Sequence, residues 1–178
     1  MVRALATSSL VQVGQDLYQF YIPVYGYGIG LSASAIGALL AMLAAASFVV
    51  RIFLPRLVAR FGDERVLRFS FYLSALGFAL VPFFESVAVL AMISFMFGLG
   101  MGCGQPITTL QIFSRSVAGR SGEMLGLRQS FNNAMRVSGP IVFGLVATAF
   151  GLPPVFWMSA LMLGGGGLLS GPPRTGSR

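Results

Sequence analysis

The stretch "RIFLPRLVARFGDERVLR" at residues 51–68 decides the fold, because it places seven charged side chains between two segments that have almost none. The segment before it, residues 4–50, has one charged side chain, Asp16. The segment after it, residues 69–114, also has one, Glu85. Such long runs without charge are not typical of a soluble domain, in which about 25% of residues are charged.

A second linker, "RSVAGRSGEMLGLR" at residues 115–128, leads into a third charge-poor segment, residues 129–173, whose single charge is Arg136. The three segments are 45 to 47 residues long. An α-helix needs about 20 apolar residues to cross a hydrocarbon core roughly 30 Å thick. Each segment therefore accommodates two crossings and a tight turn, and the sequence predicts an all-α membrane protein with six transmembrane helices.

Glycine, proline and serine mark a turn inside each segment, in "YGYGIGLSAS", "VPFFESVA" and "FGLPPV". These residues are the strongest local signals for the end of a helix. We therefore expect one six-helix transmembrane domain over residues 1–178. Its helices are predicted at approximately 5–26, 34–57, 65–83, 87–113, 122–149 and 153–170.

The composition restricts the function. The chain has 178 residues, 56% hydrophobic and 10% charged, with no His and a single Cys, so an internal disulfide is excluded and a metal site is not expected. We expect no cofactor. An intramembrane enzyme is disfavoured because paired carboxylates and metal ligands are missing, and a channel because no filter-like loop occurs. The net charge of +7 is too dispersed to indicate a nucleic-acid partner.

The arginines also predict the orientation. Short loops rich in Arg stay on the cytoplasmic side of a membrane. Both linkers are Arg-rich, Arg3 precedes the first helix, and Arg174 and Arg178 follow the last, whereas the three turns contain no Arg. We therefore expect a multi-pass protein of the cell (inner) membrane with both termini and both linkers in the cytoplasm.

The linker between the second and third helices resembles a signature of the major facilitator superfamily of transporters, G-x-x-x-D-R-x-G-R-[RK]. In "PRLVARFGDER" at 55–65, Arg60 and Gly62 match the Arg and second Gly of that signature. The other positions depart from it, as in a decayed copy: Pro55, Ala59, Asp63, Glu64 and Arg65. The resemblance is greatest to the C-terminal six-helix half of a family member. It implies a half-bundle built as a 3+3 inverted repeat.

Two further stretches agree with this family. "FMFGLGMGCGQPITT" at 95–109 resembles its Gly-rich fourth helix, and "SGPIVFG" at 138–144 resembles its Gly-Pro motif at a gating helix. The resemblance implies that Gly139 and Pro140 form a gate or hinge; a packing groove with a fixed kink is the alternative. It also implies that the loop residues form a charge network that latches the transporter, unless they only set topology: Arg56, Arg60, Gly62, Asp63 and Arg65.

The first helix carries a polar stripe within "LVQVGQDLYQF" at 10–20. Its members follow i, i+3, i+4, i+7 spacing, which places them on one helix face: Gln12, Gln15, Asp16 and Gln19. Asp16 lies about eleven residues into the helix, or roughly 17 Å deep. A buried ion at that depth is costly unless it faces a wet cavity or a protein interior. We predict a cavity-lining face; a hydrogen-bonded helix seam is the alternative. A cleaved signal peptide would not include this stripe.

The fifth helix repeats the pattern with Gln129, Asn132, Asn133 and Arg136. Arg136 lies about fourteen residues from its cytoplasmic end, or roughly 20 Å deep, so it reaches a depth similar to that of Asp16. Gln105, beside Pro106 in the fourth helix, is expected to reach the same cavity. The resemblance implies that the first, second, fourth and fifth helices border the cavity.

These residues suggest alternating-access transport of a small solute by half of a secondary transporter. Asp16 is a candidate for proton coupling, because desolvation favours the neutral form of a carboxyl group. Arg136 would bind an anionic substrate group or neutralise Asp16; a permanent Asp16–Arg136 pair would make both structural. The expected partners are the lipid bilayer, the solute, and a missing N-terminal half or second six-helix chain. The alternative is a truncated or self-associating six-helix membrane protein without transport activity.

Overall fold

The computed structural model describes residues 2–115 and 121–170, and the side chains of residues 2–4, 115 and 121 are not described. Arg174 and Arg178 lie outside these ranges, and so does the side chain of Arg3. Within the described ranges the chain forms six α-helices and one 3-10 helix. They are α1 (Val2–Gly28), α2 (Ala33–Phe61), α3 (Asp63–Leu80), η1 (Val81–Phe83), α4 (Val87–Arg115), α5 (Ser121–Phe150) and α6 (Leu152–Leu169). Each helix end lies within about a turn of the position expected from the sequence.

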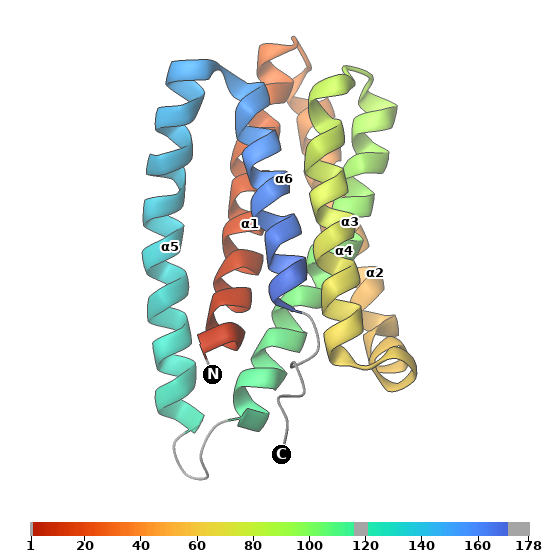
Figure 1. Cartoon of the computed structure of the whole chain (residues 1–178). Helices are drawn as coiled ribbons and strands as arrows, with labels where there is room; N and C mark the ends of the chain where they lie inside the picture. Colours follow the sequence, from red (N-terminus) through yellow and green to blue (C-terminus); the bar gives the residue numbers. More distant parts are fainter. Residues whose placement is uncertain (1, 116–120, 171–178) are drawn as a thin grey trace.

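The helices run up and down in one bundle (Figure 1). The α1–α2, α3–α4 and α5–α6 turns lie together at one end of the bundle, and the α2–α3 connection lies at the other end with the start of α1. α4 packs against α2, α3 and α1, and α6 packs against α3 and α1. α5 stands at the edge, and its main neighbour is α1.

Local residue chemistry explains the connections. The hydroxyl oxygen of Ser32 accepts a hydrogen bond from the backbone N–H of Ala35 at 3.3 Å and caps the start of α2. Gly62 alone connects α2 to α3, with φ +82° and ψ 152°. That conformation is essentially restricted to glycine. The Gly that matched the loop signature is therefore required by a one-residue turn.

A row of glycines on α4 lets its neighbours approach closely. A Cβ on Gly98 would lie 2.5 Å from the carbonyl oxygen of Leu43, and one on Gly102 would lie 2.8 Å from Ser47 Cα, both on α2. Gly100 faces α3, and Gly104 faces Val11 of α1. Small residues of this kind allow close packing of helices in membranes, where hydrophobicity cannot drive association.

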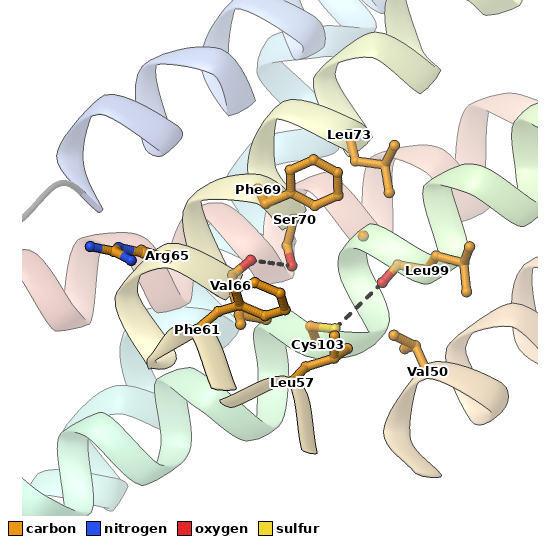
Figure 2. A pocket seen from close by; sticks show the side chains of 11 residues that line it. Val50, Leu57, Phe61, Arg65, Val66, Phe69, Ser70, Leu73, Leu99 and Cys103 are labelled. Carbon is orange, nitrogen blue, oxygen red and sulfur yellow. Dashed lines mark hydrogen bonds between the residues drawn. The ribbon is translucent and has the colours of Figure 1, made fainter. Parts of the chain in front are cut away.

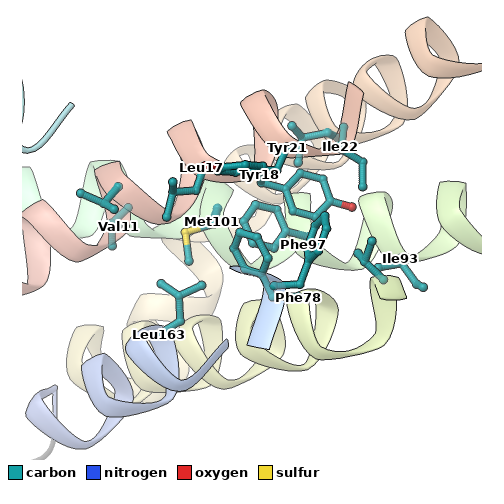
Figure 3. Close-up of a cluster of buried hydrophobic side chains, with 14 of the residues drawn as sticks. Val11, Leu17, Tyr18, Tyr21, Ile22, Phe78, Ile93, Phe97, Met101 and Leu163 are labelled. Carbon is teal, nitrogen blue, oxygen red and sulfur yellow. The ribbon is translucent and has the colours of Figure 1, made fainter. Parts of the chain in front are cut away.

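The buried core lies between α1, α3, α4 and α6, and aromatic rings dominate it (Figure 3). The ring of Tyr18 stacks on Phe97 with centroids 4.0 Å apart and meets Phe78 edge-on at 5.4 Å. The Tyr18 hydroxyl forms a 3.0 Å hydrogen bond with Ser94. Tyr25 donates to the carbonyl oxygen of Phe84 at 3.3 Å. Both tyrosines therefore belong to the packed core.

Within the described residues, five helical segments are long and apolar enough to cross a membrane, and they correspond to α2 through α6, with η1 continuing α3. The first helix is not among them, although the sequence analysis counted six crossings. Its 27 residues are long enough, so its polar stripe and its tyrosines are the reason. α1 instead lies between α4, α5 and α6 along its length. The 3+3 inverted repeat stays a prediction.

Burial differs strongly among the spans. In α4, 56% of the most apolar window is buried inside the molecule, compared with 22% in α2 and 6% in α5. α2 and α5 therefore present most of their surface outward. Their outward residues include polar side chains on α5, such as Gln129 and Arg136. Polar side chains on an outward surface make the face that α1 shares with α2 and α5 the candidate functional site.

Candidate functional site

A continuous set of polar contacts connects α1, α4 and α5. The side-chain amide of Gln12 donates to both carboxylate oxygens of Asp16, at 3.1 and 3.0 Å. The amide of Gln105 donates to the Gln12 side-chain oxygen at 2.6 Å. Arg128 completes the set, because its Nη2 donates to Gln105 Oε1 at 2.8 Å and its Nε donates to Ser8 Oγ at 2.6 Å. Asp16 is thus linked to a buried guanidinium by two amides.

The second cation of α5 contacts Asp16 directly. The Nε atom of Arg136 lies 3.5 Å from Asp16 Oδ2. The carboxylate side chain is 14% exposed, whereas the arginine side chain is 65% exposed. Arg136 therefore reaches inward from an open face to a carboxylate at the rim of the bundle. The pairing expected from similar depths is present, and it lies on the outward face.

The polar residues of α5 divide into two groups. The hydroxyl of Ser9 donates to Asn132 Oδ1 at 3.3 Å, and this contact is buried between α1 and α5. Gln129 donates to Asn133 at 3.4 Å on the exposed side of the helix. Asn132 therefore lies in a hydrogen-bonded seam between α1 and α5. Gln129 and Asn133 lie beside Arg136 on the open face.

The polar residues of α1 divide in the same way. Gln12 and Asp16 point toward α4 and α5, as their contacts show. Gln15 and Gln19 instead line a cavity of about 490 Å³ between α1 and α2, together with Arg51. The four residues of the predicted stripe therefore divide between two sites. Gln12 and Asp16 contact α4 and α5, whereas Gln15 and Gln19 line the cavity beside α2.

Two arginines in these places were not anticipated as site residues. Arg128 was counted with the charged linker although the helix predicted at 122–149 contains it; α5 begins at Ser121, so Arg128 lies two turns inside the helix. Its spacing of four residues from Asn132 places both side chains toward α1 and was the available signal. Arg51 was interpreted only as the first charge of the other linker, although the helix predicted at 34–57 contains it; in the structure it lines the cavity between α1 and α2.

The loop motif lies at the connection between α2 and α3. Asp63 opens α3 and accepts a hydrogen bond from the Gln111 side chain of α4 at 2.8 Å. Among the described residues no ion pair joins Asp63 to Arg56, Arg60 or Arg65, because that carboxylate is directed at α4. Arg60 lies over the ring of Phe61 at 5.4 Å. The predicted latch to another half of a transporter stays a prediction.

The Gly139–Pro140 pair lies within an uninterrupted α5. Gly139 is buried against α1, and a Cβ there would lie 3.7 Å from Val13, which is an ordinary contact distance. The site thus allows close packing, and its role as a hinge stays a prediction.

One apolar cavity is separate from these polar contacts. This cavity, shown in Figure 2, has a volume of about 540 Å³ and lies between α2, α3 and α4, with Phe69, Leu73 and Cys103 among its lining residues. Its surface is almost entirely carbon, apart from Arg65 at its edge. No group of three or more His, Cys, Asp or Glu side chains in the described part of the chain could hold a metal ion. The polar chemistry is concentrated at Asp16.

Comparison with known proteins agrees with this arrangement. The chain is 30% identical over 105 residues to the uncharacterized MFS-type transporter YuxJ of Bacillus subtilis (strain 168), a match covering 58% of this chain and 26% of that protein. It is 32% identical over 113 residues to the multidrug resistance protein MdtG of Serratia proteamaculans (strain 568), covering 62% and 27%. It is 24% identical over 158 residues to MdtG of Klebsiella pneumoniae (strain 342), covering 86% and 38%.

The matched regions therefore span well under half the length of these relatives. The family model of the Major Facilitator Superfamily matches residues 4–176. That range includes every described helix from α2 to α6 and nearly all of α1. The chain thus belongs to the Major Facilitator Superfamily.

Proposed function

We propose that this chain acts as one six-helix half, most like the C-terminal half, of a secondary transporter that moves a small solute by alternating access. The observation that carries the proposal is the ion pair between Asp16 and Arg136 on an outward face that is rich in amides. A carboxylate and a guanidinium are expensive in hydrocarbon, so this face requires water or protein opposite it.

A second six-helix unit is the proposed covering for this face. Substrate sites in transporters of this kind lie between two structural repeats, near the middle of the bilayer. α2 and α5 flank the face, and their most apolar windows are only 22% and 6% buried. They therefore have free surface for contact with such a unit, whether it belongs to the same polypeptide or to another chain.

Proton coupling is assigned to Asp16. Its carboxylate is balanced by Arg136 at 3.5 Å and by the amide of Gln12. Binding of one proton to a carboxylate oxygen would remove its negative charge and weaken its attraction to Arg136. Release of the proton on the other side of the membrane would restore the pair. Two conformations of the transporter would therefore differ in whether Asp16 and Arg136 are paired, and proton binding would shift the equilibrium between them.

The location and direction follow from the charges and the relatives. The Arg-rich α2–α3 connection lies at the same end of the bundle as the start of α1. We place this end in the cytoplasm, with both termini, in the inner membrane of a bacterial cell. Because two relatives are multidrug resistance proteins by name, we propose efflux of amphipathic solutes.

The test is proton-coupled flux in everted membrane vesicles from cells that express the native coding region. Vesicles are energised, their internal acidification is followed with a pH-sensitive dye, and ethidium or benzoate is then added. Asp16→Asn should abolish the solute-induced proton release, because the variant has no titratable group at this position. Glu85→Gln is the matched control, since it removes a carboxylate from an exposed turn. Full pH-driven flux in Asp16→Asn would remove the coupling role.

A separate measurement addresses the partner. Crosslinking in native membranes should capture α5 or α2 against a second six-helix unit. Capture of a second copy of this chain would support the self-associating alternative. If α2 and α5 form no crosslink to any further six-helix unit, within one polypeptide or between two, both arrangements are contradicted.

A further inference from the structure

The cavity between α1 and α2 combines polar and apolar walls. Its volume is about 490 Å³, which is within the range of small-molecule sites. The α1 side is polar and is formed by Gln15 and Gln19. The α2 side is mixed, with Ser47 and Arg51 as its polar residues and Leu40, Leu43, Ala44 and Phe48 as its apolar residues. This lining is suited to a solute that has a polar end and an apolar body.

Three polar groups at this cavity are unused within the molecule. Arg51, Gln15 and Gln19 form no side-chain hydrogen bond or ion pair with any other described residue. The neighbouring amide of Gln12 differs, because it is held by Asp16 and Gln105. One cavity is therefore lined by a guanidinium with five N–H donors and by two carboxamides, without an internal acceptor among the described residues.

The charges on this face indicate which class of ligand it would bind. Asp16 is paired with Arg136 at 3.5 Å. Arg51 is then a cation for which the described face offers no carboxylate. It lies ten residues before the end of α2 at Phe61, roughly 15 Å along the helix. Its side chain is exposed at this cavity, where an anionic partner would balance its charge.

We propose that this cavity binds the anionic group of an amphipathic solute, a carboxylate or a phosphonate. The planar guanidinium of Arg51 matches the two oxygens of such a group. The amides of Gln15 and Gln19 donate to the same oxygens, and the ring of Phe48 contacts the apolar body. This inference rests on the proposed transport function and names the class of its substrate.

The first experiment measures binding without transport. The only cysteine of the sequence, Cys103, is buried in α4 at 3% exposure. A thiol-reactive fluorogenic maleimide therefore reports unfolding of the purified protein in neutral detergent. A bound ligand raises the midpoint temperature according to its affinity. Benzoate and phenylphosphonate should raise it, whereas the neutral isostere benzamide should not.

Variants locate the binding site. Arg51→Gln should weaken benzoate binding about ten- to a hundred-fold, as expected when a hydrogen bond to a charged group is lost. Arg51→Lys should retain part of the affinity, because it keeps the charge. Arg68→Gln is the control, since it removes the same charge from α3, away from this cavity. Three results would overturn the proposal. Benzoate could raise the midpoint temperature of Arg51→Gln as much as that of the native protein, benzamide could raise it as much as benzoate, or neither anion could raise it in the native protein.

Transport separates this proposal from the general function. If native vesicles move ethidium and benzoate, Arg51→Gln should raise KM for benzoate and leave that for ethidium unchanged. Equal effects on both solutes would refute the anion site while the transporter stands. Absence of coupled flux for every solute would instead refute the proposed function, and the binding assay would still decide the anion site.

Discussion

Substitution of Gly98 by alanine tests the packing that positions the polar face. The new Cβ would lie 2.5 Å from the Leu43 carbonyl oxygen and 2.8 Å from the Cβ of Ala46. Both atoms are fixed to the backbone of α2, so no side-chain rotation relieves the contact. α2 and α4 would have to separate by roughly 1 Å to restore ordinary contact distances.

The expected cost can be worked out from these contacts. Overpacking of a close interface costs about 1–3 kcal/mol. The separation also strains the hydrogen bond from the Ser47 hydroxyl to the Gly98 carbonyl oxygen, now 3.1 Å, and its loss would cost about 0.5–1.5 kcal/mol more. The higher helix propensity of alanine offsets up to about 1 kcal/mol of this destabilisation. We expect a net destabilisation of about 1–3 kcal/mol.

Gly144→Ala in α5 is the matched control. No atom lies within 4 Å of a Cβ built there, so only the propensity gain of up to about 1 kcal/mol applies. Reversible unfolding in mixed detergent and dodecyl sulfate micelles, followed by circular dichroism, gives both free energies of unfolding. A Gly98→Ala protein as stable as Gly144→Ala would refute close α2–α4 packing as the basis of the arrangement.

Two further predictions use the same unfolding measurement. Arg128→Met should lose about 1–3 kcal/mol, because it leaves Ser8 and the side-chain oxygen of Gln105 without their donor; unchanged stability would show that this guanidinium is not needed inside the bundle. Gly62→Ala should lose about 1–3 kcal/mol through backbone strain alone, since no atom lies within 4 Å of the added Cβ. Gly126→Ala, equally open but in a regular helix, is its control, and equal stability of these two variants would contradict the strain argument.

The helix positions could be predicted from the sequence because their signals are local. Charge-free segments, and Gly, Pro and Ser between them, mark the ends of each helix without knowledge of any neighbour. The single-residue connection at Gly62 coincides with a motif position for the same reason. The pairing of Asp16 with Arg136 was also accessible, since depth along two helices that enter from one side depends only on residue count.

The use of each polar side chain could not be predicted in this way. A stripe at i, i+3, i+4 spacing is wide enough to touch two neighbours, so Gln12 meets α4 whereas Gln15 meets the α2 cavity. Which neighbour lies on each side depends on tertiary packing. Arg128 was missed because a cation near a linker resembles a topology signal, and its contacts with Ser8 and Gln105 depend on how α1, α4 and α5 pack.

The packing of α4 and the chemistry of the polar face depend on each other. Gly104 has no side chain, so Val11 of α1 can approach until a Cβ on that glycine would lie 2.7 Å from it. Gln105 and Gln12 are the next residues along each helix, and this approach brings their amides to 2.6 Å. Gln12 in turn holds both oxygens of Asp16. The glycine therefore determines the orientation of the carboxylate, because a wider α1–α4 spacing would break the amide contact and leave Arg136 as the neighbour that orients Asp16.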